Sequence, residues 1–260
     1  MKKFIIDIKK YYKYIWYSGI SDLKSEVSRS YLGCLWWFIN PLLFNIIYIF
    51  LSKIVFGKSE TYFSLFILIG IISWNFFNSM LLSSLKILEN NKQIISKVYI
   101  PKYILVISKS ISLSIKYFIS FIIVIVFIFY YKINFNFNML YIFLIFLVYY
   151  IFTVSVSILV MHLSVLIEDM QNILNLFLKI LFYISGVFYN INKRIPKPYK
   201  SILSRINPTA FFIIEFRKVI LYNVSPSFKG LTFWLIISII ILNIGIRLVR
   251  KYDNTYVKVI

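Results

Sequence analysis

Long runs of apolar residues, separated by short polar or basic stretches, dominate the pattern along this 260-residue chain. An apolar run of about 18 residues or more is long enough to cross the hydrocarbon core of a bilayer as a helix. The pattern therefore predicts an all-α, polytopic membrane protein with six transmembrane helices. The expected spans are residues 35–56, 62–85, 104–130, 139–167, 173–189 and 231–249.

The first 31 residues mix apolar and basic positions instead of forming a continuous apolar run. Apolar residues recur at helical spacing at Ile8, Tyr11, Tyr12, Ile15, Trp16 and Ile20. Residues 1–31 are therefore predicted to form a cytoplasmic amphipathic helix in the membrane interface, followed by a permease domain over 32–260. An ordinary solvated helix is the alternative, but Trp and Tyr favour the interface. The early apolar run is too short for a cleavable signal, so we expect the first residues to be retained.

Two polar segments interrupt the apolar runs. Residues 86–102, "KILENNKQIISKVYIPK", form a short basic link between the second and third spans. Residues 190–230 contain four of the six prolines, and their apolar stretch "FFIIEFRKVI" is too short to cross a bilayer. We expect 190–230 to be a re-entrant or interfacial helical segment.

Six spans place both termini on the same side of the membrane. With the termini in the cytoplasm, fifteen Lys and Arg residues fall inside and eleven fall outside. The positive-inside rule supports this orientation by a narrow margin. The basic segment 190–230, which would lie outside, is the part of the chain that conflicts with the rule.

Composition narrows the classes of function further. The chain is 60% hydrophobic with a net charge of +20, which in a soluble protein would favour nucleic acid. Because the basic residues cluster between apolar runs, lipid headgroups are the expected partner and nucleic acid is not. One cysteine, Cys34, excludes an internal disulfide, and one histidine, His162, favours a packing role over a metal site.

A fragment of a nucleotide-binding motif occurs at Gly57-Lys58-Ser59. A P-loop needs a second glycine five residues before the first of these, and Ser52 stands there. A P-loop also joins a strand to a helix, whereas Gly57 follows a long apolar run. We therefore interpret these residues as the end of a membrane helix at the headgroups.

Catalytic groups are sparse. Glu168 and Asp169 are the only paired carboxylates at an expected membrane face, and adjacent positions on a helix diverge by about 100°. No zinc-protease, cysteine-cluster or nucleophile-elbow motif occurs in the sequence. We expect no catalytic and no metal-binding residues on this chain.

Three lysines lie more than one turn inside expected spans: Lys109, Lys116 and Lys179. A charge at mid-membrane usually faces a partner or a wet cavity. Lys109 and Lys116 are seven residues apart and share a helical face, which would suit a conduit for an anionic substrate. Snorkelling to the headgroups is the favoured interpretation for Lys109 and Lys179, and both interpretations stay open for the deeper Lys116.

Several motifs resemble one family of membrane proteins and occur in the family's order over nearly the whole chain. They are Asp22-Leu23-Lys24, Leu32-Gly33-Cys34-Leu35-Trp36, Asn40-Pro41-Leu42, "KVYIP" at 97–101, Ser185-Gly186-Val187, and Asn207-Pro208 with the downstream Arg217. The chain resembles the permeases of ABC transporters that export O-antigen, teichoic acid or capsule polysaccharide. Ser21, Glu168 and Gly186 depart from the family pattern, which places the roles of those single residues in doubt.

The resemblance implies a permease subunit and no enzyme activity on this chain. ATP and Mg²⁺ would bind a separate P-loop ATPase, two permeases would pair with two ATPases, and the cargo would be a lipid-linked glycan. The location would be the bacterial cytoplasmic membrane, with 86–102 as the coupling segment and 190–230 on the outer side.

Within this frame, the residues expected to couple to the ATPase are Glu89, Lys92, Lys97 and Pro101. The residues expected to line the conduit are Lys116, Trp36, Trp37 and Trp74. Two other functions stay open: a permease of the same architecture that exports a small lipophilic compound, and a stand-alone membrane enzyme of envelope-lipid synthesis.

Overall fold

Five long apolar helices form the body of the protein in the computed structural model, which describes residues 2–55, 62–196, 199–253 and 256. They are α2 (Trp36–Val55), α3 (Phe63–Leu85), α6 (Lys102–Tyr130), α7 (Tyr141–Leu166) and α12 (Phe228–Lys251). Each is long and apolar enough to cross a membrane. They match the first four and the last of the predicted spans, and the described residues contain no strand.

The remaining predicted span, 173–189, corresponds to a shorter helix. Helix α8 (Met170–Ile184) has 15 residues, which at 1.5 Å per residue reach about 22 Å, against about 30 Å of hydrocarbon. Residues 185–189 stay apolar in sequence but turn, with Gly186 at a φ of +65°. A crossing count of six therefore stays a prediction.

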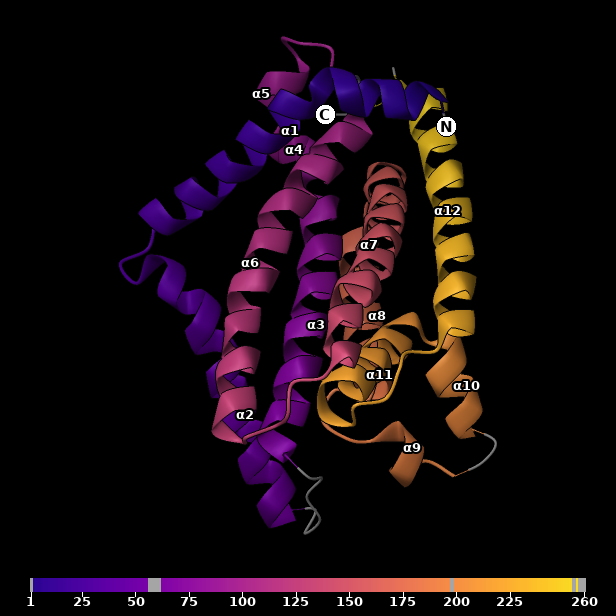
Figure 1. Ribbon diagram of the computed structural model, residues 1–260. Helices are drawn as coiled ribbons and strands as arrows, with labels where there is room; N and C mark the ends of the chain where they lie inside the picture. Colours follow the sequence, from indigo (N-terminus) through magenta and orange to yellow (C-terminus); the bar gives the residue numbers. More distant parts are fainter. Residues whose placement is uncertain (1, 56–61, 197–198, 254–255, 257–260) are drawn as a thin grey trace.

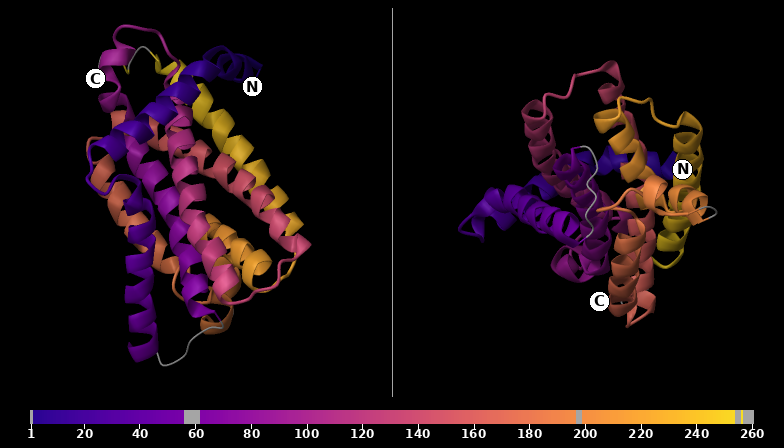
Figure 2. Two further views of the ribbon diagram at one scale, coloured as in Figure 1. Left: turned by 60° about the vertical axis from the view of Figure 1, so that its left-hand side comes forward. Right: turned by 90° about the horizontal axis from the view of Figure 1, so that it is seen from below.

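Helix α3 lies at the centre of the bundle and packs against α2, α6, α7, α8 and α11. Figure 1 shows α2 and α12 on opposite sides of this centre, and the end-on view in Figure 2 agrees. Helix α12 runs along α7. Most side chains of α3 are buried against neighbouring helices, and its polar residues Asn75, Asn78 and Ser83 lie on a partly exposed stripe.

Helix α1 (Lys2–Ser28) crosses the end of the bundle where both termini lie and then slopes down along α6 (Figure 1). Phe4, Ile15 and Leu23 are buried against the bundle, while Trp16 and Tyr17 are exposed. Of the positions predicted to share the apolar face, Ile15 is buried, whereas Tyr12 and Trp16 are exposed. A short 3₁₀ helix, η1 (Gly33–Leu35), then leads into α2.

Gly19 allows α1 to approach α6 closely. A Cβ atom at this position would lie 3.0 Å from the Ser108 carbonyl oxygen and 3.1 Å from the Ile111 Cβ. A side chain there would push α1 away from α6.

The predicted coupling segment forms two short helices, α4 (Ile87–Asn90) and α5 (Lys92–Ile95), at the end that holds the termini. The Asn91 side-chain amide donates to the Ile87 carbonyl at 2.7 Å and holds the two together. Pro101 is buried and precedes the first residue of α6.

The opposite end contains η2 (Phe137–Leu140), α9 (Ile191–Arg194), α10 (Tyr199–Ile206) and α11 (Pro208–Leu221) (Figure 1). Helix α11 packs between α3 and α7, with Phe212, Ile213 and Phe216 fully buried. With 14 residues α11 is too short to cross a bilayer, and its re-entrant position stays a prediction. The motif fragment Gly57-Lys58-Ser59 lies outside the described residues.

Candidate functional site

Two cavities flank α2 and contain the residues predicted to line a conduit. The first, here the α6-side cavity, lies between α2, α3 and α6 and has a volume of about 380 Å³. Its wall includes Trp36, Trp37, Lys116 and Tyr117. Three of the four predicted conduit residues are thus brought together, although Lys116 is on a different helix from the two tryptophans.

The second, here the α8-side cavity, lies between α2, α3 and α8 and has a volume of about 720 Å³. Phe44 and Asn75 line both cavities, so the two adjoin one another across α2 and α3. Trp74, the fourth predicted residue, reaches this second cavity but is only 6% exposed. Its ring packs 5.3 Å from the Phe182 ring, so it serves mainly to support the wall.

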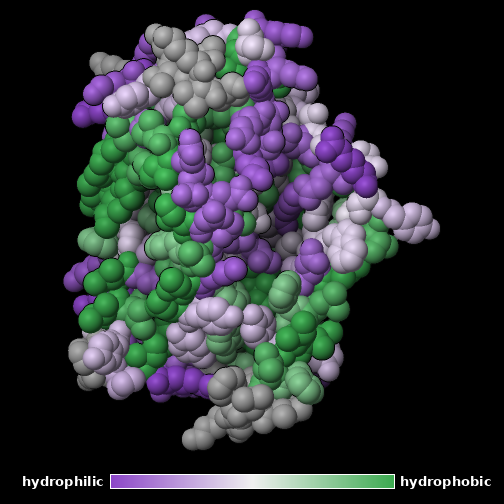
Figure 3. Space-filling view, turned by 180° about the vertical axis from the view of Figure 1, so that it is seen from behind, coloured by the Kyte–Doolittle hydropathy of each residue, from purple (hydrophilic) through white to green (hydrophobic). Residues whose placement is uncertain are grey.

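Amide groups, aromatic rings and the lysine Lys179 supply the polar chemistry of the α8-side cavity. Its wall includes Asn75, Asn78 and Asn175, together with the aromatic rings of Tyr48 and Tyr183. Each amide both donates and accepts hydrogen bonds, and each ring presents a flat apolar face. Figure 3 shows hydrophilic residues extending from the upper end of the molecule into the middle of the face seen from behind, between hydrophobic flanks.

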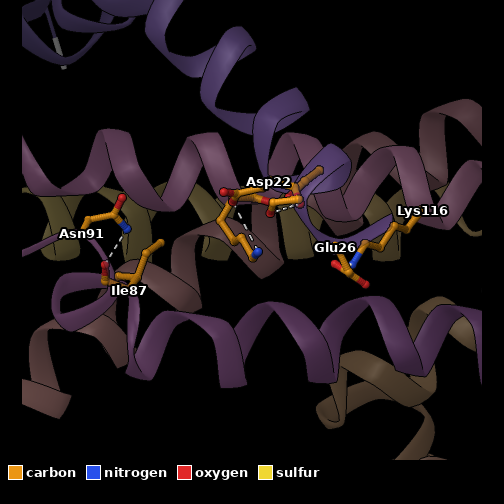
Figure 4. Close-up of polar contacts among 8 residues, drawn as sticks. Asp22, Glu26, Ile87, Asn91 and Lys116 are labelled. Carbon is orange, nitrogen blue, oxygen red and sulfur yellow. Dashed lines mark hydrogen bonds and ion pairs between the residues drawn. The ribbon is translucent and has the colours of Figure 1, made fainter. Parts of the chain in front are cut away.

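Lys116 makes an ion pair with Glu26 of α1, and its Nζ also lies 5.7 Å from the centre of the Trp37 ring. Figure 4 shows the Glu26 carboxylate directed at the Lys116 ammonium group. The lysine therefore lines the α6-side cavity, but Glu26 already neutralises its charge. Sequence reasoning weighed a substrate against the headgroups and missed this carboxylate, which lies on a helix that slopes down beside α6.

The lysines of α6 repeat every seven residues, and each has a carboxylate partner. Lys109 lies 3.3 Å from Asp22 of α1, and Lys102 lies 3.0 Å from Asp253 beyond α12. A spacing of seven keeps the lysines near one face of the helix. Two of the three partners come from α1, so these ion pairs attach α1 along α6.

The residues predicted to couple to an ATPase fall into two groups. Glu89, Lys92 and Lys97 are exposed on α4, α5 and the link that follows. Pro101 is buried and lies at the start of α6. Three charged side chains are thus free to contact a partner at the end of the bundle that holds the termini, and the proline is placed to pass a displacement to α6.

The start of α6 is tied to both ends of the chain. Tyr103 donates a hydrogen bond to Asp7 of α1, and Arg250 of α12 lies 3.5 Å from the same carboxylate. The Tyr11 hydroxyl donates to the Tyr99 carbonyl at 3.2 Å. A hydrogen bond to Asp253, together with burial, raises the pKa of Tyr99 above its ordinary value. A displacement of residues 86–102 would therefore move α1, α6 and α12 together.

Arg217 forms a buried cluster that sequence reasoning did not single out as a site. Its guanidinium donates to the Phe66 carbonyl at 3.1 Å, to the Gly186 carbonyl at 2.8 Å and to the Val187 carbonyl. The Gly186 and Val187 carbonyls are backbone groups freed where α8 ends, and they would otherwise stay unpaired in an apolar surrounding, whereas the Phe66 carbonyl belongs to α3. An arginine in an apolar stretch is itself the signal that could have identified this cluster.

The turn after α8 is fixed by a second polar contact. The Asn207 side chain caps α11 by accepting from the Ala210 amide, and its Nδ2 donates to the Ser185 hydroxyl at 3.1 Å. The Ser185–Val187 and Asn207–Arg217 motifs are therefore parts of one structural unit that holds the re-entrant helix in place.

The groups considered for catalysis are not gathered into a site. Glu168 and Asp169 are both exposed in the turn before α8. His162 is buried and shares a 2.6 Å hydrogen bond between its Nδ1 and the Tyr256 hydroxyl. Within the described residues, no three His, Cys, Asp or Glu side chains are close enough to hold a metal ion.

Comparison with known proteins agrees with this architecture. The family model of ABC-2 type transporters matches residues 20–221, so the chain belongs to that family and is a membrane permease of the ABC type. An O-antigen export system permease protein RfbA of Klebsiella pneumoniae is 27% identical over 240 residues, which cover 92% of each chain. A protein of the same name from Myxococcus xanthus is 20% identical over 221 residues, 85% of each chain.

Proposed function

We propose that this chain is the permease subunit of an ATP-driven exporter that moves a lipid-linked polysaccharide across the bacterial cytoplasmic membrane. The observation that carries the proposal is the α8-side cavity, whose wall combines three asparagine amides with aromatic rings. Sugars present hydroxyl groups around an apolar ring face, so amides and aromatic rings complement both parts. The similarity to O-antigen permeases supports the same cargo class.

ATP hydrolysis in this proposal takes place on a separate P-loop subunit that also holds Mg²⁺. That subunit would dock at the end of the bundle that holds the termini, against Glu89, Lys92 and Lys97. Both termini would lie in the cytoplasm. Membership of the ABC-2 family supports an ATPase partner, and the exposure of these three side chains supports the docking position.

A second copy of the chain would complete the conduit. Helices α2 and α8, which border the α8-side cavity, expose apolar side chains such as Ile47, Phe50, Phe177 and Ile180. A facing copy would cover these side chains and enclose the cavity between two permeases. Both copies would then present amides and rings to the same cargo.

The test is purification of the chain from its own host in mild detergent, followed by mass spectrometry of the proteins that accompany it. A P-loop ATPase in near-equal amount, with a permease dimer after crosslinking in the membrane, is the expected result. The purified complex is then reconstituted in vesicles, where ATP should drive the transfer of a lipid-linked glycan. A preparation without an ATPase would overturn the proposal, and transport of a small lipophilic compound in place of the glycan would overturn the cargo class.

A further inference from the structure

A third cavity borders the α8-side cavity at Leu82. It has a volume of about 390 Å³ and is enclosed by α1, α3, α4 and α6 near the end of the bundle that holds the termini. One water molecule requires only about 10–15 Å³ of such space, so the cavity is large enough for a small polar group. We call it the headgroup cavity.

The polar wall of the headgroup cavity carries one net positive charge. Its charged side chains are Lys86, Lys109 and Asp22. Asp22 lies 3.3 Å from Lys109 and offsets its charge. Lys86 has no ion-pair partner among the described residues, so its ammonium group is available to an anion.

Neutral donors complete this wall. Hydroxyl groups come from Ser18, Ser83 and Ser108, and an amide comes from Asn90. Ser108 is 2% exposed, and its Oγ makes no hydrogen bond within the part of the chain that the structure describes. A buried hydroxyl without a partner is unfavourable, and a ligand oxygen in the cavity would provide the missing partner.

The position of the headgroup cavity matches the depth of lipid phosphates. Lys86 directly follows the last residue of α3, and basic side chains at the ends of membrane helices typically meet the headgroup region. Leu82, Ile87 and Leu105 form an apolar part of the wall. Leu82 also lines the α8-side cavity, so apolar surface continues from the headgroup cavity toward the bilayer core.

We propose that the headgroup cavity binds the phosphodiester headgroup of an anionic bilayer phospholipid. Lys86 neutralises the single negative charge of the phosphodiester, and the Ser108 hydroxyl and Asn90 amide donate to its oxygens. An acyl chain leaves along Leu82. One net positive charge suits a singly charged phosphodiester, whereas Asp22 would repel a pyrophosphate group that carries more negative charge.

The lipid bound in this cavity would attach α1 to the ends of α3 and α4. Asp22 of α1 and Asn91 beside α4 both line the cavity, and the close-up in Figure 4 draws Asn91 to the left of Asp22. The lipid would therefore stabilise the segment that leads from the predicted coupling residues into α1. This inference concerns the membrane around the permease and does not depend on which cargo is exported.

The experiment measures the thermal unfolding of the purified full-length chain after exchange into a neutral detergent. The probes are dioleoylphosphatidylglycerol, dioleoylphosphatidylcholine, inorganic phosphate and a polyprenyl pyrophosphate, each added at equal concentration. We expect phosphatidylglycerol to raise the Tm most. Lys86→Gln should weaken the apparent affinity for phosphatidylglycerol about tenfold, and Ser108→Val should also weaken it.

Lys97→Gln is the matched control, because Lys97 is exposed in the same segment and does not line the cavity. It should keep the wild-type response. If Ser108→Val fails to fold, the exposed Lys86 still provides the test. An equal response of Lys86→Gln and wild type overturns the proposal. So does a Tm rise that is largest with phosphatidylcholine, inorganic phosphate or the polyprenyl pyrophosphate.

Discussion

The Lys102 Nζ lies 3.0 Å from the Asp253 Oδ1 and joins the first residue of α6 to the segment after α12. The lysine is 3% exposed, so almost none of its charge is solvated by water. Asp253→Asn removes the countercharge and should lower the free energy of unfolding by about 1–3 kcal/mol. Thermal unfolding of the purified protein measures this, with Asp169→Asn in an exposed turn as the control.

A double variant distinguishes the cost of burying an unpaired charge from a general disruption of the packing around Lys102. Lys102→Met combined with Asp253→Asn leaves no buried charge and should recover part of the lost stability, because the desolvation penalty disappears. A double variant that is less stable than Asp253→Asn alone would contradict this explanation.

The ion pair between Glu26 and Lys116 predicts a charge-exchange result. Lys116→Glu alone places two carboxylates together and should lower both stability and export, by about 1–2 kcal/mol for stability. Adding Glu26→Lys restores the ion pair with its two charges exchanged between α1 and α6, and should recover stability. Recovery of export in the double variant would show that Lys116 attaches α1 to α6. Continued loss of export despite restored stability would instead assign Lys116 to an anionic part of the cargo.

Arg217 should tolerate no substitution that loses the planar guanidinium. Arg217→Lys keeps the charge but cannot donate to the carbonyls of Phe66, Gly186 and Val187 at once, and should reduce stability by about 2–4 kcal/mol. Arg205→Lys on the exposed helix α10 is the control and should have little effect. Thermal unfolding and the amount of protein in the membrane are the measurements.

A substitution at Gly70 of α3 tests the Arg217 cluster independently. A Cβ atom there would lie 2.7 Å from both the Arg217 Nη2 and the Val187 carbonyl oxygen, closer than real Cβ contacts. Gly70→Ala should therefore displace the cluster and destabilise the protein by about 1–3 kcal/mol, as overpacking does in other cores. Wild-type stability in this variant would show that the turn after α8 can move without cost.

We predict that removing an amide from the wall of the α8-side cavity reduces glycan export selectively. Asn78→Leu removes one hydrogen-bonding group from the wall and adds no charge, so the rate of ATP-driven glycan transfer should fall about tenfold, as for the loss of one or two hydrogen bonds. Asn172→Leu, on the exposed face of α8, is the matched control. A small lipophilic cargo would be insensitive to Asn78→Leu, so an unchanged rate would favour that alternative.

The exposed coupling residues predict a separation of ATP hydrolysis from export. Lys97→Glu reverses a charge on the surface where the ATPase is proposed to dock, and should reduce export several-fold while hydrolysis by the reconstituted complex continues. Lys229→Glu makes the same change on an exposed residue at the other end of the bundle and should have little effect. Normal export by Lys97→Glu would remove this residue from the coupling surface.

Much of the candidate site could be predicted because its residues lie in local patterns. Trp36 and Trp37 line a cavity beside α2, and Glu89, Lys92 and Lys97 are exposed in a short link between two membrane helices, where the apolar pattern breaks. Trp74 was harder to place, since periodicity does not say which aromatic residues of an all-apolar helix meet a cavity. It is mostly buried against Phe182.

The sequence by itself determined the all-helical membrane architecture, and it predicts the amphipathic first helix, the short coupling link and the re-entrant segment. Each depends on hydrophobic run length and periodicity, which are local properties of the chain. Only the tertiary structure decided that α8 ends at Ile184, that Lys109 and Lys116 meet carboxylates of α1, and that Arg217 binds the backbone after α8. These features depend on side chains from distant segments, and charge pairing and backbone hydrogen bonds between such segments are specified only once the helices pack.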